Sequence, residues 1–184
     1  MRAVLLALVL LADGSVPGRD LRLGMRLTYA SGGAEQPAWR VDSLVRDLAH
    51  EGRTGCLFVR FSPGDARTVC ASGDTIFAWS PATRRWTSSR IVAPNATLEI
   101  RQASLGRVVF TTGAMETDTI SAVPIPVVVT RVSTFDGSGR ELRRLDERYA
   151  PGLLTATSGA FAEPDTARTG AWRVTRRFEL VRIE

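Results

Sequence analysis

The chain has 184 residues, of which 44% are hydrophobic, and all 24 of its basic residues are arginines. The formal net charge is only +5, and the arginines alternate with acidic residues, as in 140–148, instead of forming a run. This pattern argues against a nucleic-acid-binding domain, whose basic residues gather on one face or in one segment.

The first residues have the layout of a secretory signal peptide. Met1 and Arg2 precede an apolar run at residues 3–12, and the polar residues Asp13-Gly14-Ser15 follow. Ten helical residues rise ~15 Å, half of a ~30 Å hydrocarbon core, so we expect cleavage rather than anchoring. We therefore predict a signal peptide at 1–14 and one β-rich domain at 15–184 that is periplasmic or secreted, without stable membrane insertion. The alternative is a buried first element of a cytosolic domain.

Two segments near the start of the predicted domain are candidate strands. Residues 21–30 alternate between apolar and polar side chains, which is typical of a half-buried strand, and Gly32-Gly33 ends the pattern. Residues 39–50 fit either a strand or a helix. We favour the strand, because a Gly-rich turn joins this segment to a clear preceding strand.

The two cysteines flank a predicted hairpin turn. Residues 56–61 and 67–71 lie on either side of Ser62-Pro63-Gly64-Asp65, and Pro-Gly suits the centre of a turn. A hairpin centred on Pro63 places Cys56 opposite Cys70, where cross-strand Cβ atoms are ~4.5–5.5 Å apart and close to disulfide reach. In an exported protein we expect these cysteines to pair, whereas in a cytosolic one they would be free and buried.

The rest of the chain reads as a series of short strands. We expect them at residues 75–80, 86–92, 97–102, 107–112, 123–135, 140–150, 153–161 and 171–183. Pro124 and Pro126 cannot donate to a sheet, so they belong at a strand's beginning or on an edge. Residues 140–150 also fit a helix, but the short Gly-rich turn before them favours a hairpin partner. The buried face of the last segment changes near Leu180, which indicates a bulge.

Ten or more short strands at regular spacing, with no long helix after the apolar run, define the expected fold class. The sequence predicts a mainly β protein, built as a single antiparallel curved sheet (a half-barrel) or as a sandwich. We expect at most one or two short helices.

Few groups in the chain are suited to catalysis. The sequence lacks the G-x-S-x-G motif and the glycine-rich phosphate loops, and two cysteines with one histidine are too few for a metal site. We expect no cofactor. His50 lies beside Glu51-Gly52, so we expect an exposed loop rather than a catalytic base. Glu116 and Asp118 stand two residues apart and would share one face of a strand. Such a pair can serve a carboxylate-based hydrolase or hold calcium, but no partner acids for a calcium site are evident.

Aromatic and basic residues gather around one predicted turn. Phe77, Trp79 and Trp86 flank Arg84-Arg85. If they are exposed, the indoles and guanidinium groups could hold a sugar, an acyl chain or an anionic headgroup. The alternative is that the aromatic residues belong to the core. The candidate ligand-binding residues are Trp79, Arg84, Arg85, Trp86 and Trp39.

Three stretches resemble a known kind of protein. The segments GMRLTYASGG (24–33), AWRVDSLV (38–45) and ERYAPGLLTA (147–156) are similar to exported bacterial β-rich proteins of the TapB-like type. The resemblance covers about a third of the chain. It implies a periplasmic or secreted curved sheet, related in shape to the LolA-like half-barrels that hold lipid in a concave face.

Three functions are compatible with the sequence. The first is a non-enzymatic exported domain that binds an apolar or amphipathic ligand, or an envelope component, in a concavity lined by residues such as Leu23, Leu27 and Trp39. The second is a structural or interaction module that assembles through a sheet edge at 127–135. The third is an envelope hydrolase that uses carboxylates such as Glu116 and Asp118.

Overall fold

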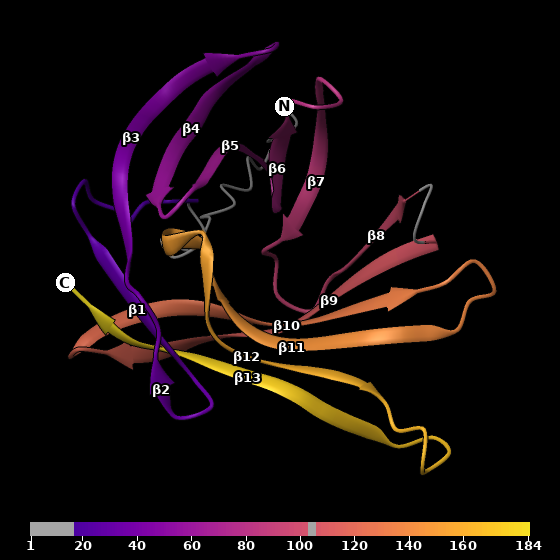
Figure 1. The fold of residues 1–184 in the computed structure, drawn as a ribbon. Coiled ribbons are helices and arrows are strands. Elements are labelled where there is room, and N and C mark those ends of the chain that lie inside the picture. The colour runs from indigo at the N-terminus through magenta and orange to yellow at the C-terminus, as the bar shows by residue number, and fades with distance from the viewer. Residues whose placement is uncertain (1–16, 103–105) are drawn as a thin grey trace, which may run out of the picture.

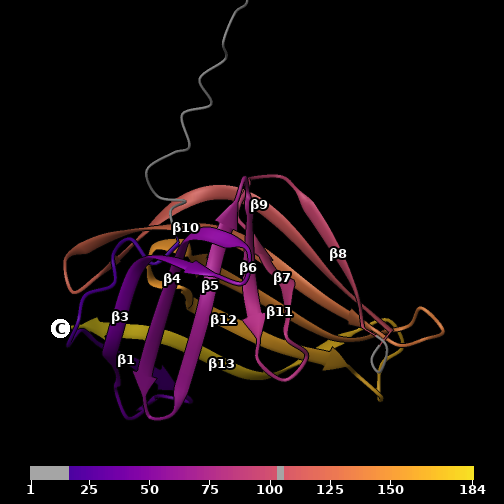
Figure 2. The same cartoon turned by 90° about the horizontal axis from the view of Figure 1, so that it is seen from above.

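The computed structural model describes residues 17–102 and 106–184, so the predicted signal peptide at 1–14 lies outside the described residues. Thirteen strands form one antiparallel sheet that curls until it is nearly closed and barrel-like (Figures 1 and 2). The prediction of a mainly β protein with a single curved sheet is confirmed. The strands are β1 (Arg26–Ser31), β2 (Ala34–Glu35), β3 (Trp39–His50), β4 (Arg53–Ser62), β5 (Asp65–Ser72), β6 (Thr75–Ser80), β7 (Arg85–Ile91), β8 (Thr97–Gln102), β9 (Gly106–Ile120), β10 (Val123–Phe135), β11 (Glu141–Ala150), β12 (Thr155–Pro164) and β13 (Trp172–Ile183).

The sheet closes on one side and stays open on the other. Its order is β7-β6-β5-β4-β3-β1-β13-β12-β11-β10-β9-β8, with β2 paired to β1. The β3–β7 side arches over the β8–β13 side in Figure 1, and β1 joins the two by pairing with both β3 and β13. The edge strands β7 and β8 diverge without pairing. Thr112 ties the loop between them to β9, because its hydroxyl accepts from Ala96 N–H at 2.9 Å and donates to Ala93 O.

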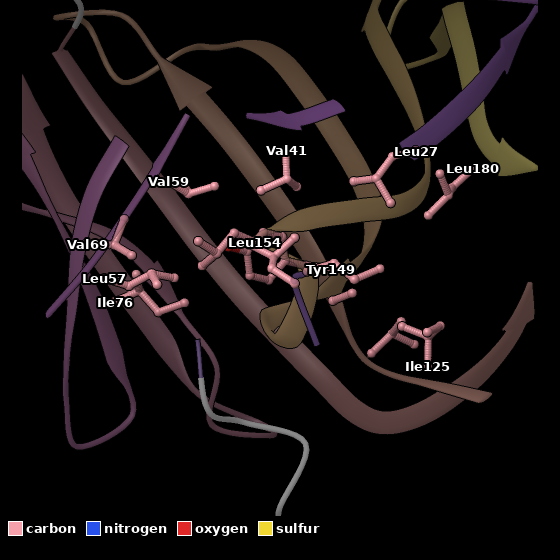
Figure 3. Close-up of a cluster of buried hydrophobic side chains, with 14 of the residues drawn as sticks. Leu27, Val41, Leu57, Val59, Val69, Ile76, Ile125, Tyr149, Leu154 and Leu180 are labelled. Atoms are coloured by element: carbon pink, nitrogen blue, oxygen red, sulfur yellow. The ribbon is translucent and has the colours of Figure 1, made fainter. Parts of the chain in front are cut away.

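The core fills the space between the two sides of the sheet. A 3-10 turn, η2 (Pro151–Leu153), folds into this space and meets the N-terminal residues, with Gly18 N–H donating to Pro151 O at 2.9 Å. Figure 3 shows Leu154 in the middle of the cluster. The buried apolar residues are Leu21, Leu27, Val41, Leu57, Val59, Phe61, Val69, Ile76, Val92, Ile120, Ile125, Val127, Val128, Tyr149, Ala150, Leu153, Leu154 and Leu180.

Both segments with an alternative helical reading are strands, β3 and β11, as favoured from the sequence. The expected bulge near Leu180 is also present. Thr28 pairs with Arg182 and Tyr29 with Leu180, so Val181 is the extra residue on β13. Extra residues of this kind shift the side chains that follow to the other face of the sheet.

Two strand boundaries were predicted too early. The alternating segment 21–30 becomes a strand only at Arg26, because Leu21 turns into the core and Gly24 takes a φ of +83°. The segment 153–161 begins pairing only at Thr155, because Leu154 closes the 3-10 turn with a φ of 54°. Both positive φ values break the extended backbone that a strand needs.

Two other local expectations were wrong. His50 is the last residue of β3 and is half-buried, not part of an exposed loop. The segment 127–135 is not a sheet edge, since β10 pairs with β9 on one side and with β11 on the other. Pro124 and Pro126 do lie at the beginning of β10, before its pairing with β11 starts at Val128.

The β4–β5 hairpin has the register expected from its turn. Leu57 pairs with Val69 and Phe61 with Asp65, which centres the hairpin on Pro63. Cys56 and Cys70 form a disulfide with a Cα–Cα distance of 4.3 Å. Side chains alternate along a strand, so the disulfide lies on the outer face of the sheet while Leu57 and Val69 point to the core.

No helix within residues 17–102 and 106–184 is long and apolar enough to cross a membrane. The Cys56–Cys70 disulfide is compatible with a protein that works outside the cytoplasm.

Candidate functional site

An aromatic cleft opens on the inner face of the sheet, where β1 and β3 meet β12 and β13. Its volume of about 410 Å³ lies within the range of ~300–1,000 Å³ that is typical of small-molecule sites. The residues that line it are Tyr29, Ser31, Gln36, Pro37, Trp39, Pro63, Thr155, Phe161, Arg176 and Phe178.

A continuous row of rings runs through the aromatic cleft and into the core. The ring of Trp39 lies 6.0 Å from that of buried Phe61 and 6.3 Å from that of Tyr29. On the other side, Tyr29 lies 6.2 Å from Phe178, whose ring is 6.0 Å from Phe161. These centroid distances are those of favourable tilted and edge-to-face pairs. The rings therefore support one another and form a preformed apolar wall.

A glycine makes room for one ring of this wall. Gly159 on β12 pairs with Phe178 on β13, and a Cβ at Gly159 would lie 2.6 Å from Cζ of Phe178. The same Cβ would lie 3.2 Å from a methyl group of Leu145. The missing side chain therefore lets the Phe178 ring lie across β12, next to Phe161.

The hydroxyl of Tyr29 is fully used inside the protein. It shares a hydrogen bond of 2.7 Å with Thr155 Oγ1 and donates to Ala156 O at 3.0 Å. Burial raises the pKa of Tyr29 to about 12, against a smaller lowering by the bond to Thr155. Tyr29 thus stays neutral at physiological pH and fastens β1 to β12 beneath the aromatic cleft.

The charged pair of Arg90 and Glu147 lies deeper on the inner face. Arg90 reaches from the edge strand β7 to β11, where its Nη2 is 3.2 Å from Glu147 Oε1. The Glu147 side chain is only 3% exposed. The guanidinium also stands over the rings of Phe110 and Tyr149, at 5.2 and 5.1 Å. Among the described residues, no other ion pair connects the β3–β7 side of the sheet (residues 39–91) with the β8–β13 side (residues 97–183).

The contact with Arg90 compensates only part of the cost of burying the Glu147 carboxylate. Its Oε1 has no hydrogen-bond partner, because the Arg90 guanidinium is close enough for an ion pair but is not aligned for a hydrogen bond. Burial raises the pKa of Glu147, and the opposing attraction of Arg90 is the smaller effect. The pair therefore holds the open side of the sheet together at an electrostatic cost.

The predicted tryptophan site lies on the outer face and is already occupied by the protein. The Trp79 and Trp86 rings are 5.4 Å apart, and the His50 ring stands edge-on to them at 5.1 and 5.8 Å. Trp86 Nε1 donates to Glu51 O at 3.1 Å. Arg53 stacks over Trp86 at 5.5 Å. These contacts fold the tip of the β3–β4 hairpin onto the β6–β7 hairpin.

The five predicted ligand-binding residues do not form one site. Arg84 and Arg85 are exposed at the turn of the β6–β7 hairpin, near Trp79 and Trp86. Trp39 lies elsewhere, in the aromatic cleft. Sequence reasoning missed its companions Tyr29, Phe161 and Phe178. The alternation of 21–30 and 171–183 was the available signal, but it does not reveal that these two segments become neighbours.

The carboxylate pair shares one face, as predicted, and is neutralised by a cation. Arg148 lies 2.5 Å from a Glu116 oxygen and 2.6 Å from an Asp118 oxygen, and the Thr157 hydroxyl donates to Asp118. Partial burial acts to raise the pKa of Asp118, but the hydrogen bonds from Arg148 and Thr157 outweigh it and lower the pKa. An aspartate held ionised in this way is unsuited to donate the proton that glycoside cleavage needs.

Comparison with known proteins adds no assignment: no family model, curated protein or solved structure matches the chain. The similarity to TapB-like and LolA-like proteins stays a prediction. Among the described residues there is no group of three or more His, Cys, Asp or Glu side chains that could hold a metal ion.

Proposed function

We propose that this protein binds an apolar or amphipathic small molecule in the aromatic cleft and acts outside the cytoplasm, in the periplasm or as a secreted protein. The observation that carries the proposal is the row of half-buried rings of Tyr29, Trp39, Phe161 and Phe178 around a volume of about 410 Å³. Rings that are already in mutual contact can receive a ligand without rearrangement, which lowers the cost of binding.

The filled core restricts where such a ligand can bind. Leu27, one of the expected lining residues, is 1% exposed and belongs to the core, while Leu23 is 69% exposed at a separate surface groove. Of the three expected lining residues, Trp39 is the one in the aromatic cleft. Each 100 Å² of apolar surface that a ligand covers there would contribute roughly 2.5 kcal/mol before the costs of association.

The location outside the cytoplasm is supported by the Cys56–Cys70 disulfide. Disulfides form and persist in oxidising compartments and are rare in the cytosol. The apolar run at residues 3–12 supports the same location, since it has the length and flanks of a signal peptide.

A fluorescence titration with the neutral probe N-phenyl-1-naphthylamine tests the proposal. We expect saturable binding to the full chain and a loss of at least about tenfold in affinity for Trp39→Leu, which removes part of the wall. Gln36→Trp fills the aromatic cleft from an exposed position and should have the same effect without disturbing the core.

Trp79→Leu is the matched control, because it removes a tryptophan from the outer face. It should leave the affinity unchanged. Binding that survives both cleft substitutions but is lost in Trp79→Leu would move the site to the outer tryptophans, and the absence of any saturable binding would refute the proposal.

A further inference from the structure

We propose that the ligand of the aromatic cleft carries an anionic head, a carboxylate or a phosphate monoester, and that Arg176 binds this head. The inference rests on the proposed function and specifies its ligand class as a single-chain anionic amphiphile. It follows from which polar groups around the aromatic cleft already have partners and from the position of the one charged group in the lining.

The sheet register places Arg176 beside the rings. Arg176 pairs with Phe161 across the β12–β13 ladder, and it stands two residues before Phe178 on β13. Residues two apart on a strand share a face, so all three side chains lie on the inner face. Phe178 is half-buried whereas Arg176 is exposed, which puts the guanidinium at the mouth and the rings further inside.

The other polar side chains of the lining already have partners within the protein. Ser31 Oγ donates to Arg177 O at 2.9 Å, and Gln36 Nε2 donates to Ala34 O at 3.3 Å. Thr155 Oγ1 is bonded to the Tyr29 hydroxyl. In the part of the chain that the structure describes, Arg176 has no hydrogen bond or ion pair of its side chain. The Trp39 indole and the second N–H of Gln36 are neutral donors, so the Arg176 guanidinium is the one charged donor that the lining offers to a ligand.

The only charged side chain in the lining of the aromatic cleft is the cation Arg176. The lining contains no carboxylate. The nearby inner-face acids are held by other cations, since Asp65 pairs with Arg67 at 2.5 Å and Glu147 pairs with Arg90 at 3.2 Å. A guanidinium offers two parallel N–H donors that match the oxygens of a carboxylate or a phosphate. An apolar chain on the rings with an anionic head at the mouth satisfies both parts of the site.

Calorimetric titration with three ligands of equal chain length tests this assignment. We compare decanoate, decyl phosphate and decanol, each as a monomer in low-salt buffer at neutral pH. The two anionic ligands should bind about tenfold more tightly than decanol, which corresponds to a single charge-assisted hydrogen-bonded contact. The advantage should shrink as salt is added, because Arg176 is exposed.

Arg176→Gln is the test variant and Arg177→Gln its matched control. Arg177 is the next residue on the same strand and also exposed, but it lies on the other face of the sheet. Arg176→Gln should abolish the advantage of decanoate and decyl phosphate while leaving decanol binding unchanged. Arg177→Gln should retain the advantage.

The outcomes separate this inference from the proposed function. Equal affinity for all three ligands, unaffected by Arg176→Gln, would overturn the anionic head and leave the aromatic cleft as a binding site. Loss of the advantage in Arg177→Gln but not in Arg176→Gln would also overturn it. If none of the three ligands binds, the proposed function itself fails.

Discussion

Replacing Arg90 with methionine would leave Glu147 inside the curled sheet without its cation. At 3.2 Å and an effective dielectric constant of ~20, the attraction between the two charges is about 5 kcal/mol. Desolvation of the buried carboxylate offsets much of it, and removal of one partner from a buried pair typically costs ~3–5 kcal/mol. Arg90 remains 24% exposed, so we expect the low end, a loss of about 3 kcal/mol in the free energy of unfolding at pH 7.

The loss should depend on pH in a defined direction. Burial raises the pKa of Glu147 in the folded protein above its ordinary value of 4.5. Between the unfolded and the folded pKa the folded state holds more protons, so stability falls as pH rises through this window. Without Arg90 the folded pKa rises further. The deficit of Arg90→Met should therefore shrink as the pH is lowered from 7 towards 5, because protonation of Glu147 removes the unpaired buried charge.

Urea denaturation at pH 7 and pH 5 measures the loss in the free energy of unfolding. Glu147→Gln and the double variant complete a double-mutant cycle with Arg90→Met. Glu147→Gln alone should be close to neutral at pH 7, because it removes a charge that is costly to bury. The double variant should regain most of the stability lost in Arg90→Met. Additive effects of the two substitutions, or a deficit that is equal at both pH values, would refute the reasoning.

Three further predictions concern other parts of the sheet. Reduction of the Cys56–Cys70 disulfide, or its replacement by serines, should lower the free energy of unfolding by about 3 kcal/mol, as its sequence separation of 14 implies; an unchanged urea midpoint would contradict this. Because the pKa of Asp118 is lowered in the folded state, its ionised form adds stability that is present above the ordinary value of 3.8 and lost as the pH falls through the folded pKa. Asp118→Asn should therefore be less stable at pH 7 and flatten the acid unfolding curve, and an identical curve would argue against the Arg148 and Thr157 bonds. Gly159→Ala should displace the Phe178 ring, with a cost of ~1–3 kcal/mol and weaker binding of decanoate in titration; unchanged affinity would show that the ring position does not matter.

The local features of the fold were predictable because turn residues mark them. Glycine and proline separate the strands along the chain, and the symmetry of a hairpin about Pro63 sufficed to pair Cys56 with Cys70. Trp79 and Trp86 were likewise expected together, because they flank one turn of the same hairpin. They pair directly in the β6–β7 ladder.

The aromatic cleft was not predictable, because its walls come from opposite ends of the chain. Tyr29 and Phe178 meet only because β1 pairs with β13, and alternation within a strand does not specify its neighbour. The half-buried position of His50 at the end of β3 was not predicted, for a different reason. The tip of the β3–β4 hairpin bends onto the outer tryptophans, because β3 and β4 pair irregularly and Asp47 and Glu51 have positive φ values. The spacing of the residues in the sequence does not predict this bend.

The most direct test of ligand binding in the aromatic cleft is a set of intermolecular NOEs between decanoate and the isotope-labelled protein. We predict contacts from the chain methylenes to the Trp39 indole and the Phe178 ring, and contacts from the methylene next to the carboxylate to the Arg176 side chain. NOEs confined to Trp79 and Trp86 or to Leu23, or no NOEs from a ligand that binds, would contradict it.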